Sequence, residues 1–344
     1  MQSRCDLSEL LSRLPIKEKN TIRGEADFYG ASYLIAKKLK LPFIPFSTSN
    51  WTHGASMTKL KYKEQLTTQK EHSKCLVASK EQAEFLKDCL IDATATGLPF
   101  LYVKDVDELI IQRIPNSLLV MPPHSLPYTK HDWDEESYAR KINELRSNFD
   151  LIVVCLFSNC INDGLWVKAF EKYNIPWIEG ADPYDKHALL RIYRIFNSFE
   201  YMTTCAPGSH IVYASYCGCK VSIYGDYQEY CEEDYKDTPV YIKYPFLLKY
   251  NLASQSEIVF KKSYPWLFCS PKHAKNMQEW ANKEIGKKNK KSALYMAYLL
   301  GWSPWNELFH LAYRGLHYIF RRIMINFFYK KIVLRFFKYF LSTN

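Results

Sequence analysis

Several patterns that would name a ligand directly are missing from this chain of 344 residues. No Cys-x-x-Cys pair occurs among its 10 cysteines, which excludes the usual zinc and thiol-redox motifs. Neither a Gly-x-Gly-x-x-Gly stretch nor a Walker phosphate loop is present, so no fingerprint identifies a dinucleotide or ATP. With only 12 glycines and 16 prolines, the chain also has little room for low-complexity linkers.

Residues 1–20 contain no apolar signal core, because charged and polar residues interrupt every hydrophobic run there. We therefore expect a cytoplasmic protein with reduced thiols, in which the cysteines serve as small buried hydrophobic residues. The length suggests about two domains.

Acidic residues are absent from Leu308 to the end, although seven Lys and Arg residues lie there. This segment accounts for most of the net charge of +10, so the rest of the chain is near neutral and no nucleic-acid partner is expected. On a helix, most of these cations would share one side, with Phe, Tyr, Ile and Leu elsewhere. We expect a basic aromatic tail, 304–344, that lies on an anionic membrane surface without crossing it. The alternative is a C-terminal helix packed on its domain.

The rest of the chain alternates between apolar strand patterns and helical patterns. This alternation predicts an α/β fold with mostly parallel sheets, organised as two Rossmann-like domains at 1–132 and 133–303. Continuous apolar runs such as 150–157 are typical of buried parallel strands. The strands expected in the first domain are 42–46, 74–79, 98–103 and 117–121.

The stretch Ala206-Pro207-Gly208-Ser209-His210 stands between a predicted strand and a predicted helix. Unpaired N–H groups and the helix dipole favour an anion at such a helix start, and Gly allows its close approach. Gly208, Ser209 and His210 are therefore candidate phosphate-binding residues. An ordinary turn with Ser209 as the helix cap would explain the same residues.

Carboxylates and histidines in the predicted loops supply candidates for proton transfer. Glu25 and Asp27 stand at a helix start, where either could be a general base or simply cap the helix. His53 and His124 follow predicted strands in loops and could line a cleft or make structural hydrogen bonds.

Other carboxylates follow strands that should end at the cleft. Glu179 and Asp182 could bind sugar hydroxyls, although a turn would also explain Asp182. Asp105 and Asp107 form an Asp-x-Asp pattern that could hold a divalent ion, and Asp105 could equally cap a helix.

Taken together, these stretches resemble bacterial GT-B-type glycosyltransferases of lipopolysaccharide or capsule biosynthesis, including the Kdo- and sialic-acid-transferases. The segment 203–225 looks like their donor-phosphate segment, and 23–30 (RGEADFYG) is similar to the stretch that carries their acceptor-activating base. The resemblance implies transfer of a sugar from a nucleotide-activated donor, with a CMP-linked acidic sugar favoured. The acceptor would be a lipopolysaccharide or another surface polysaccharide at the inner membrane.

The expected mechanism uses no metal or other cofactor. Glu25, or else Asp27, takes the acceptor proton, with His53 next in order as the base. His124, Glu179, Asp182, Gly208, Ser209 and His210 are the expected donor-binding residues. One alternative is a metal-dependent GT-A-type transferase using Asp105 and Asp107. Another is a non-catalytic, membrane-associated scaffold with a degenerate nucleotide fold.

Overall fold

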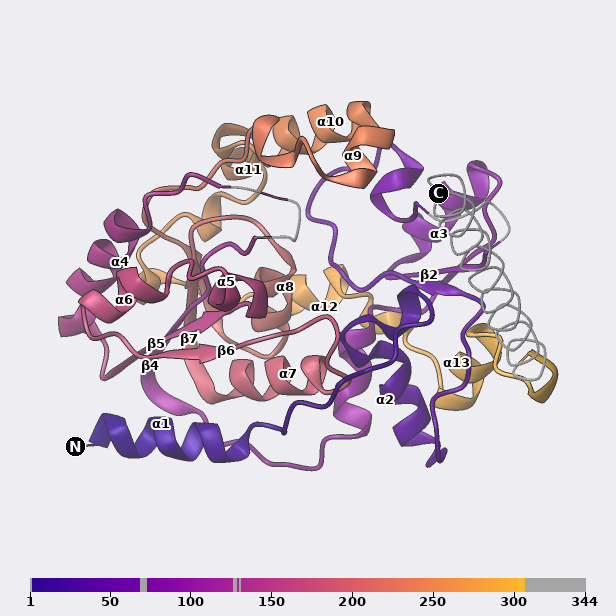
Figure 1. Ribbon diagram of the computed structural model, residues 1–344, viewed down its shortest axis with the longest axis horizontal. Coiled ribbons are helices and arrows are strands. Elements are labelled where there is room, and N and C mark those ends of the chain that lie inside the picture. The colour runs from indigo at the N-terminus through magenta and orange to yellow at the C-terminus, as the bar shows by residue number, and fades with distance from the viewer. Residues whose placement is uncertain (1, 69–72, 126–128, 130, 307–344) are drawn as a thin grey trace, which may run out of the picture.

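The computed structural model describes residues 2–68, 73–125, 129 and 131–306 (Figure 1). The basic aromatic segment from 308 onward lies outside the described residues. Among the described helices, none is long and apolar enough to cross a membrane.

The larger sheet has the strand order β6-β5-β4-β7-β8, and every neighbouring pair is parallel. Its central strands are buried along most of their length, as the continuous apolar runs predict. The strands are β4 (Ile114–Val120), β5 (Leu151–Leu156), β6 (Trp177–Glu179), β7 (Phe199–Thr204) and β8 (Lys220–Ile223).

Helices cover both faces of this sheet and form two hydrophobic clusters with it. α7 packs along the sheet through a nearly continuous buried side, and its closing turn leads directly into β7 (Figure 1). The helices of this part are α4 (Glu135–Asn143), α5 (Ser158–Asn162), α6 (Val167–Lys172), α7 (Ala188–Ser198), α8 (Ser209–Tyr216) and α12 (Gln278–Glu284). Three more helices follow β8: α9 (Pro239–Lys243), α10 (Pro245–Gln255) and α11 (Glu257–Ser263).

The smaller sheet, β1-β2-β3, is also parallel. Its strands are β1 (Asn50–Trp51), β2 (Cys75–Val77) and β3 (Ala93–Ala95), and its helices are α2 (Ala31–Lys38), α3 (Lys80–Asp88) and the 3-10 helices η1 (Glu25–Gly30), η2 (Lys63–Gln65) and η3 (Pro99–Asp105). The amino-terminal helix α1 (Gln2–Arg13) instead contacts α7 of the larger unit.

Two strands expected in the first unit are absent from the described structure, which corrects those predictions. Residues 42–46 form no strand, and 99–103 fall in η3, with Leu98 as the residue that precedes the helix. Pro99 starts that helix, and Phe100 to Val103 are buried one after another. A short apolar run that is buried all round gives no periodicity by which strand and helix can be told apart.

The strand expected at 117–121 does form, as β4, but it belongs to the larger sheet and not to the first unit. It lies at the centre, between β5 and β7, with Leu118 opposite both Ile152 and Tyr201. This sheet membership corrects the placement of that strand. The domain boundaries 1–132, 133–303 and 304–344 remain a prediction.

After α12 the chain returns to the smaller unit. Leu300 accepts a hydrogen bond from the Thr48 N–H group (2.9 Å), and α13 (Ala293–Leu299) packs against α2. Figure 1 shows the two units facing one another, with α9 and α10 above them. The predicted α/β class is therefore confirmed, with two parallel sheets; the expected helical tail, from 307 onward, lies outside the described residues.

Candidate active site

Two neighbouring pockets lie where the smaller unit meets the carboxyl edge of the larger sheet. One has a volume of about 390 Å³ and the other about 350 Å³. Both are lined by His53 and Gly54 from the loop after β1 and by Pro207 and Gly208 from the loop after β7. Because the carboxyl ends of parallel strands form the usual ligand site of such sheets, these pockets are the candidate active site.

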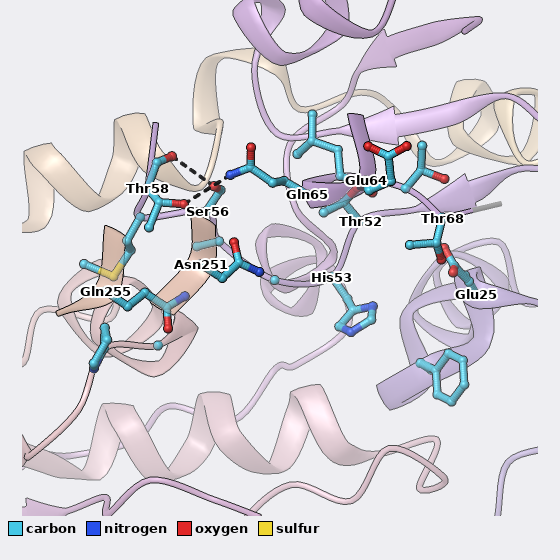
Figure 2. Close-up of a pocket in the computed structure, with 18 of the residues that line it drawn as sticks. Glu25, Thr52, His53, Ser56, Thr58, Glu64, Gln65, Thr68, Asn251 and Gln255 are labelled. Carbon is cyan, nitrogen blue, oxygen red and sulfur yellow. Dashed lines mark hydrogen bonds between the residues drawn. The ribbon is translucent and has the colours of Figure 1, made fainter. Parts of the chain in front are cut away.

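The first, which we call the polar pocket, is lined mainly by oxygen- and nitrogen-bearing side chains (Figure 2). In Figure 2, Glu25 and Glu64 lie on one side of His53, and Asn251 and Gln255 of α10 lie on the other. The labelled polar residues are Glu25, Thr52, His53, Ser56, Thr58, Glu64, Gln65, Thr68, Asn251 and Gln255. Carboxylates, amides and hydroxyls of this kind can bind a ligand that is rich in hydroxyl groups.

The second, which we call the aromatic pocket, opens at the ends of β4, β5 and β6. Its wall includes the rings of Tyr29, Phe157 and Tyr230 beside apolar side chains from α7. Tyr230 is supported by an edge contact with Trp133 at 5.5 Å between ring centroids. Flat, largely apolar walls of this kind suit a planar ring such as a nucleobase.

The passage between the pockets is held by contacts across the two units. The Ala55 N–H group donates to Ser209 Oγ (3.0 Å), and the Tyr213 hydroxyl donates to the His53 carbonyl. A side chain on Gly54 would approach Ser209 Oγ to 3.2 Å, so glycine allows the two loops to meet closely. The loop after β1 is therefore placed directly against the amino terminus of α8.

Two further tyrosines of the larger unit fix the same loop farther along. Tyr264 donates to the Met57 carbonyl (2.8 Å), and Tyr250 of α10 donates to the Lys59 carbonyl (2.6 Å). All these bonds go to backbone groups of 53–59. The floor of the polar pocket is thus fixed relative to α8 and α10.

The amino terminus of α8 opens into the aromatic pocket at Gly208, Ser209 and His210, which are the predicted phosphate-binding residues. The first bond of the helix joins the Ile211 N–H group to the Gly208 carbonyl (3.1 Å), so the preceding N–H groups have no partner within the helix. Ser209 Oγ accepts from Ala55 and keeps its own proton to donate.

His210 adds a second polar group at this point. Its Nε2 atom is buried and has no hydrogen-bond partner among the described residues. Burial lowers the pKa of His210 to about 3, so its ring is neutral at pH 7. A buried nitrogen without a partner is costly, and a bound ligand could satisfy it.

Glu25 is the first residue of η1, and Gly30 is the last residue of that helix. Gly30 has a φ of 76°, and a Cβ there would lie 1.9 Å from the Lys186 carbonyl oxygen. This close approach packs η1 against the larger unit and presents Glu25 to the polar pocket. His53 borders both pockets, and burial lowers its pKa, which favours the neutral ring.

Asp27, the alternative base, has a different environment. It is almost fully buried, and its carboxylate accepts hydrogen bonds from the N–H groups of Arg23 (2.9 Å) and Gly24 (3.3 Å) and from the Ser32 hydroxyl (2.5 Å). Asp27 does not line either pocket. The structure therefore gives it the capping role that the sequence left open.

We expect Asp27→Asn to lower the free energy of unfolding by about 1.5–3 kcal/mol, the usual contribution of hydrogen bonds to a charged group. Urea denaturation would measure this change, with Asp88→Asn at the exposed end of α3 as the control, which should unfold like the parent. Unchanged stability together with strongly reduced turnover would instead make Asp27 part of the chemistry.

His124 lies at the edge of the aromatic pocket, as its predicted position in a loop after a strand suggests. Its ring stacks on Phe157 at a centroid distance of 4.6 Å. This contact places an aromatic surface beside the end of β5 and extends the flat wall described above.

Glu179 and Asp182 do not line either pocket. Both pair with Lys17, where the amino-terminal segment crosses the larger unit. The Lys17 Nζ atom lies 2.6 Å from Glu179 Oε1 and 3.2 Å from Asp182 Oδ2. Burial lowers the pKa of Lys17, but its bonds to the two carboxylates outweigh this effect and raise the pKa overall. These carboxylates fasten the amino-terminal segment instead of facing the cleft.

The Asp-x-Asp pattern is also divided between two separate ion pairs. Asp105 binds Lys290 (2.7 Å), and the buried Asp107 binds Arg194 through two bonds of 2.8 and 3.1 Å. Among the described residues, no group of three or more potential metal ligands occurs. This geometry does not support the metal-dependent alternative, which needs both carboxylates on one ion.

Several pocket residues were not found by sequence reasoning. Glu64 and Gln65 lie in a polar stretch with no motif, and Asn251 and Gln255 lie on one side of α10. The only available signal was the four-residue spacing of those two amides on a helix. Tyr230 carried no signal at all, since tyrosine is common throughout this chain.

No protein-family model matches the chain, and no curated protein matches it. Among solved structures, the chain is similar to the crystal structure of the pneumococcal O-GlcNAc transferase GtfA in complex with UDP and GlcNAc. The sequence identity is 11%, the TM-score is 0.34, and the match covers 74% of this chain and 52% of that chain. This chain thus spans about half the length of that structure.

Proposed function

We propose that this protein is a glycosyltransferase that moves a sugar from a nucleotide-activated donor to a hydroxyl-bearing acceptor. The observation that carries the proposal is the meeting of two unlike pockets at the amino terminus of α8. One pocket suits a nucleoside and the other suits sugars, and a group suited to phosphate stands where they join.

In this proposal the nucleoside occupies the aromatic pocket, beside His124 and Tyr230. Its phosphate binds the unpaired N–H groups of Ser209 and His210, and the Ser209 hydroxyl and His210 Nε2 supply further hydrogen bonds. The donor sugar then passes His53 into the polar pocket, where the acceptor hydroxyl also binds.

The reaction is a displacement at the anomeric carbon of the donor. The acceptor oxygen forms a bond to that carbon, the bond from carbon to phosphate oxygen breaks, and Glu25 takes the proton from the acceptor hydroxyl. The helix terminus stabilises the negative charge of the departing nucleotide, because its N–H groups are fixed before the reaction begins.

The two carboxylates Glu25 and Glu64 favour an uncharged sugar in the polar pocket, since a sugar acid would be repelled there. A CMP-linked acidic sugar, which the family resemblance favours, would need its carboxylate placed away from both. A lipopolysaccharide or capsule acceptor at the inner face of the cell membrane is supported by the composition of 308–344, with seven cations and no acid.

A thermal-shift panel of CMP, UDP, GDP and ADP tests the donor part of the proposal. Ligand at one hundred times its dissociation constant stabilises the folded state by about 2.7 kcal/mol, so one nucleotide should raise the midpoint by several degrees. The matched control is the corresponding free nucleoside, which lacks the phosphate and should give a much smaller shift. No shift with any nucleotide would contradict the proposal.

Turnover distinguishes the enzyme from the scaffold alternative. If one nucleotide binds, hydrolysis of the corresponding nucleotide sugar, or transfer of its sugar to added saccharide acceptors, should be detectable by release of the free nucleotide. Tight binding without any release, across neutral and acidic sugars, would favour a non-catalytic role.

A further inference from the structure

α13 carries an exposed apolar side that no other described element covers. The helix packs against α2 (Figure 1), and its Met296 and Leu299 are buried. On the outer side, Leu294 is 75% exposed and Tyr298 is 70% exposed. Tyr295 stacks on Tyr298 at 5.9 Å between ring centroids, which keeps the two rings on one side of the helix.

Another exposed aromatic residue, Trp305, lies a few residues beyond the end of this helix. The chain turns at Gly301 and starts a new helix at 304, with Ser303 accepting a hydrogen bond from the Asn306 N–H group (3.1 Å). Trp305 in this first turn is 80% exposed. We call Leu294, Tyr295, Tyr298 and Trp305 the 294–305 face.

Lysines outnumber acidic residues in the surrounding sequence. Residues 284–307 contain four lysines and two acidic residues, Glu284 and Glu307, one at each end. Lys290 is paired with Asp105, whereas Lys287 and Lys288 are exposed in the turn before α13. The chain then continues into 308–344, which adds seven more cations without an acidic residue.

We propose that the 294–305 face binds the surface of an anionic lipid bilayer. Tyrosine and tryptophan suit the level of the lipid headgroups, because their rings are apolar while their polar atoms still reach water. Lysines beside them would be attracted to anionic headgroups. This contact belongs to the folded part of the chain, adds to whatever 308–344 contributes, and does not depend on the proposed glycosyl transfer.

The first test is sedimentation of the full chain with vesicles of phosphatidylglycerol and phosphatidylcholine. Replacing all four residues of the 294–305 face by Ser is expected to weaken vesicle binding at least tenfold. The control replaces Leu90, Ile110 and Ile258, which are even more exposed but lie outside this segment, by Ser, and this variant should bind as the parent does. High salt should weaken the parent's binding.

Unchanged vesicle binding in the face variant would overturn the proposal and leave the whole contact to 308–344. A change from dimer to monomer on a sizing column would also overturn it, because the face would then join two copies of the chain. Loss of folding would show that another part of the protein covers the face.

A second measurement does not depend on the fourfold variant. Vesicles that contain brominated lipid should quench part of the protein's tryptophan fluorescence, and Trp305→Phe should remove most of that quenching. This single exposed substitution should leave the thermal midpoint unchanged. Equal quenching of the parent and of the Trp305→Phe variant would overturn the proposal.

Discussion

Replacing Glu25 with Gln is expected to slow turnover by about 10²–10⁴-fold, the usual contribution of a general base. Glutamine keeps the size of the side chain in the polar pocket but cannot take a proton. Nucleotide affinity should stay close to that of the parent, because Glu25 lines the polar pocket and not the aromatic pocket. Steady-state turnover and calorimetric titration of the nucleotide would separate the two effects.

Glu64→Gln is the matched control, since Glu64 is the other carboxylate of the polar pocket. We expect it to raise the KM for the acceptor more than it lowers kcat. If Glu64→Gln shows the larger loss of kcat, the base is Glu64. If neither substitution slows turnover by tenfold, another group takes the acceptor proton. His53, which lines the same pocket, is then the next candidate.

Gly208→Ala is expected to weaken nucleotide binding by about tenfold to a hundredfold, which corresponds to the loss of one charge-assisted hydrogen bond. The new Cβ atom would lie 2.7 Å from the His210 ring, so the ring must move out of its place in the aromatic pocket. Gly208 has an extended φ of 171°, which alanine also adopts, so the backbone should keep its conformation.

The control for that measurement is Gly24→Ala. Gly24 also has an extended backbone, with a φ of −164°, and its added Cβ would meet the Ser47 carbonyl at an ordinary 3.6 Å. This variant should bind nucleotide as the parent does. Equal nucleotide affinity for Gly208→Ala and the parent would show that the phosphate does not bind at α8.

Much of the larger unit was predictable from local pattern. Buried parallel strands are continuously apolar, so β5 could be located from 150–157 alone. The turn at Ala206–His210 likewise predicted the junction of β7 and α8, because Gly and Pro interrupt both strand and helix. These features depend on neighbours in the chain.

The identity of the site depended on contacts that no local pattern records. Glu25 and Asp27 are two residues apart and share one helix start, yet one lines the polar pocket and the other caps η1 inside the protein. Glu179 was expected in the cleft because it ends a strand, but it pairs with Lys17, far away in sequence, and lines neither pocket. Burial and ion pairing, which decide these roles, follow from long-range packing.

By itself, the sequence determined the βα alternation, the strand-turn-helix at Gly208 and the uneven distribution of charge, because periodicity and composition are properties of consecutive residues. Only the tertiary structure decided that β4 is central to the larger sheet, that Ala55 meets Ser209, and that α10 supplies Asn251 and Gln255 to the polar pocket. Such pairings join residues far apart in the chain. Their free energy depends on the whole arrangement of sheets and helices, and short stretches of sequence do not encode it.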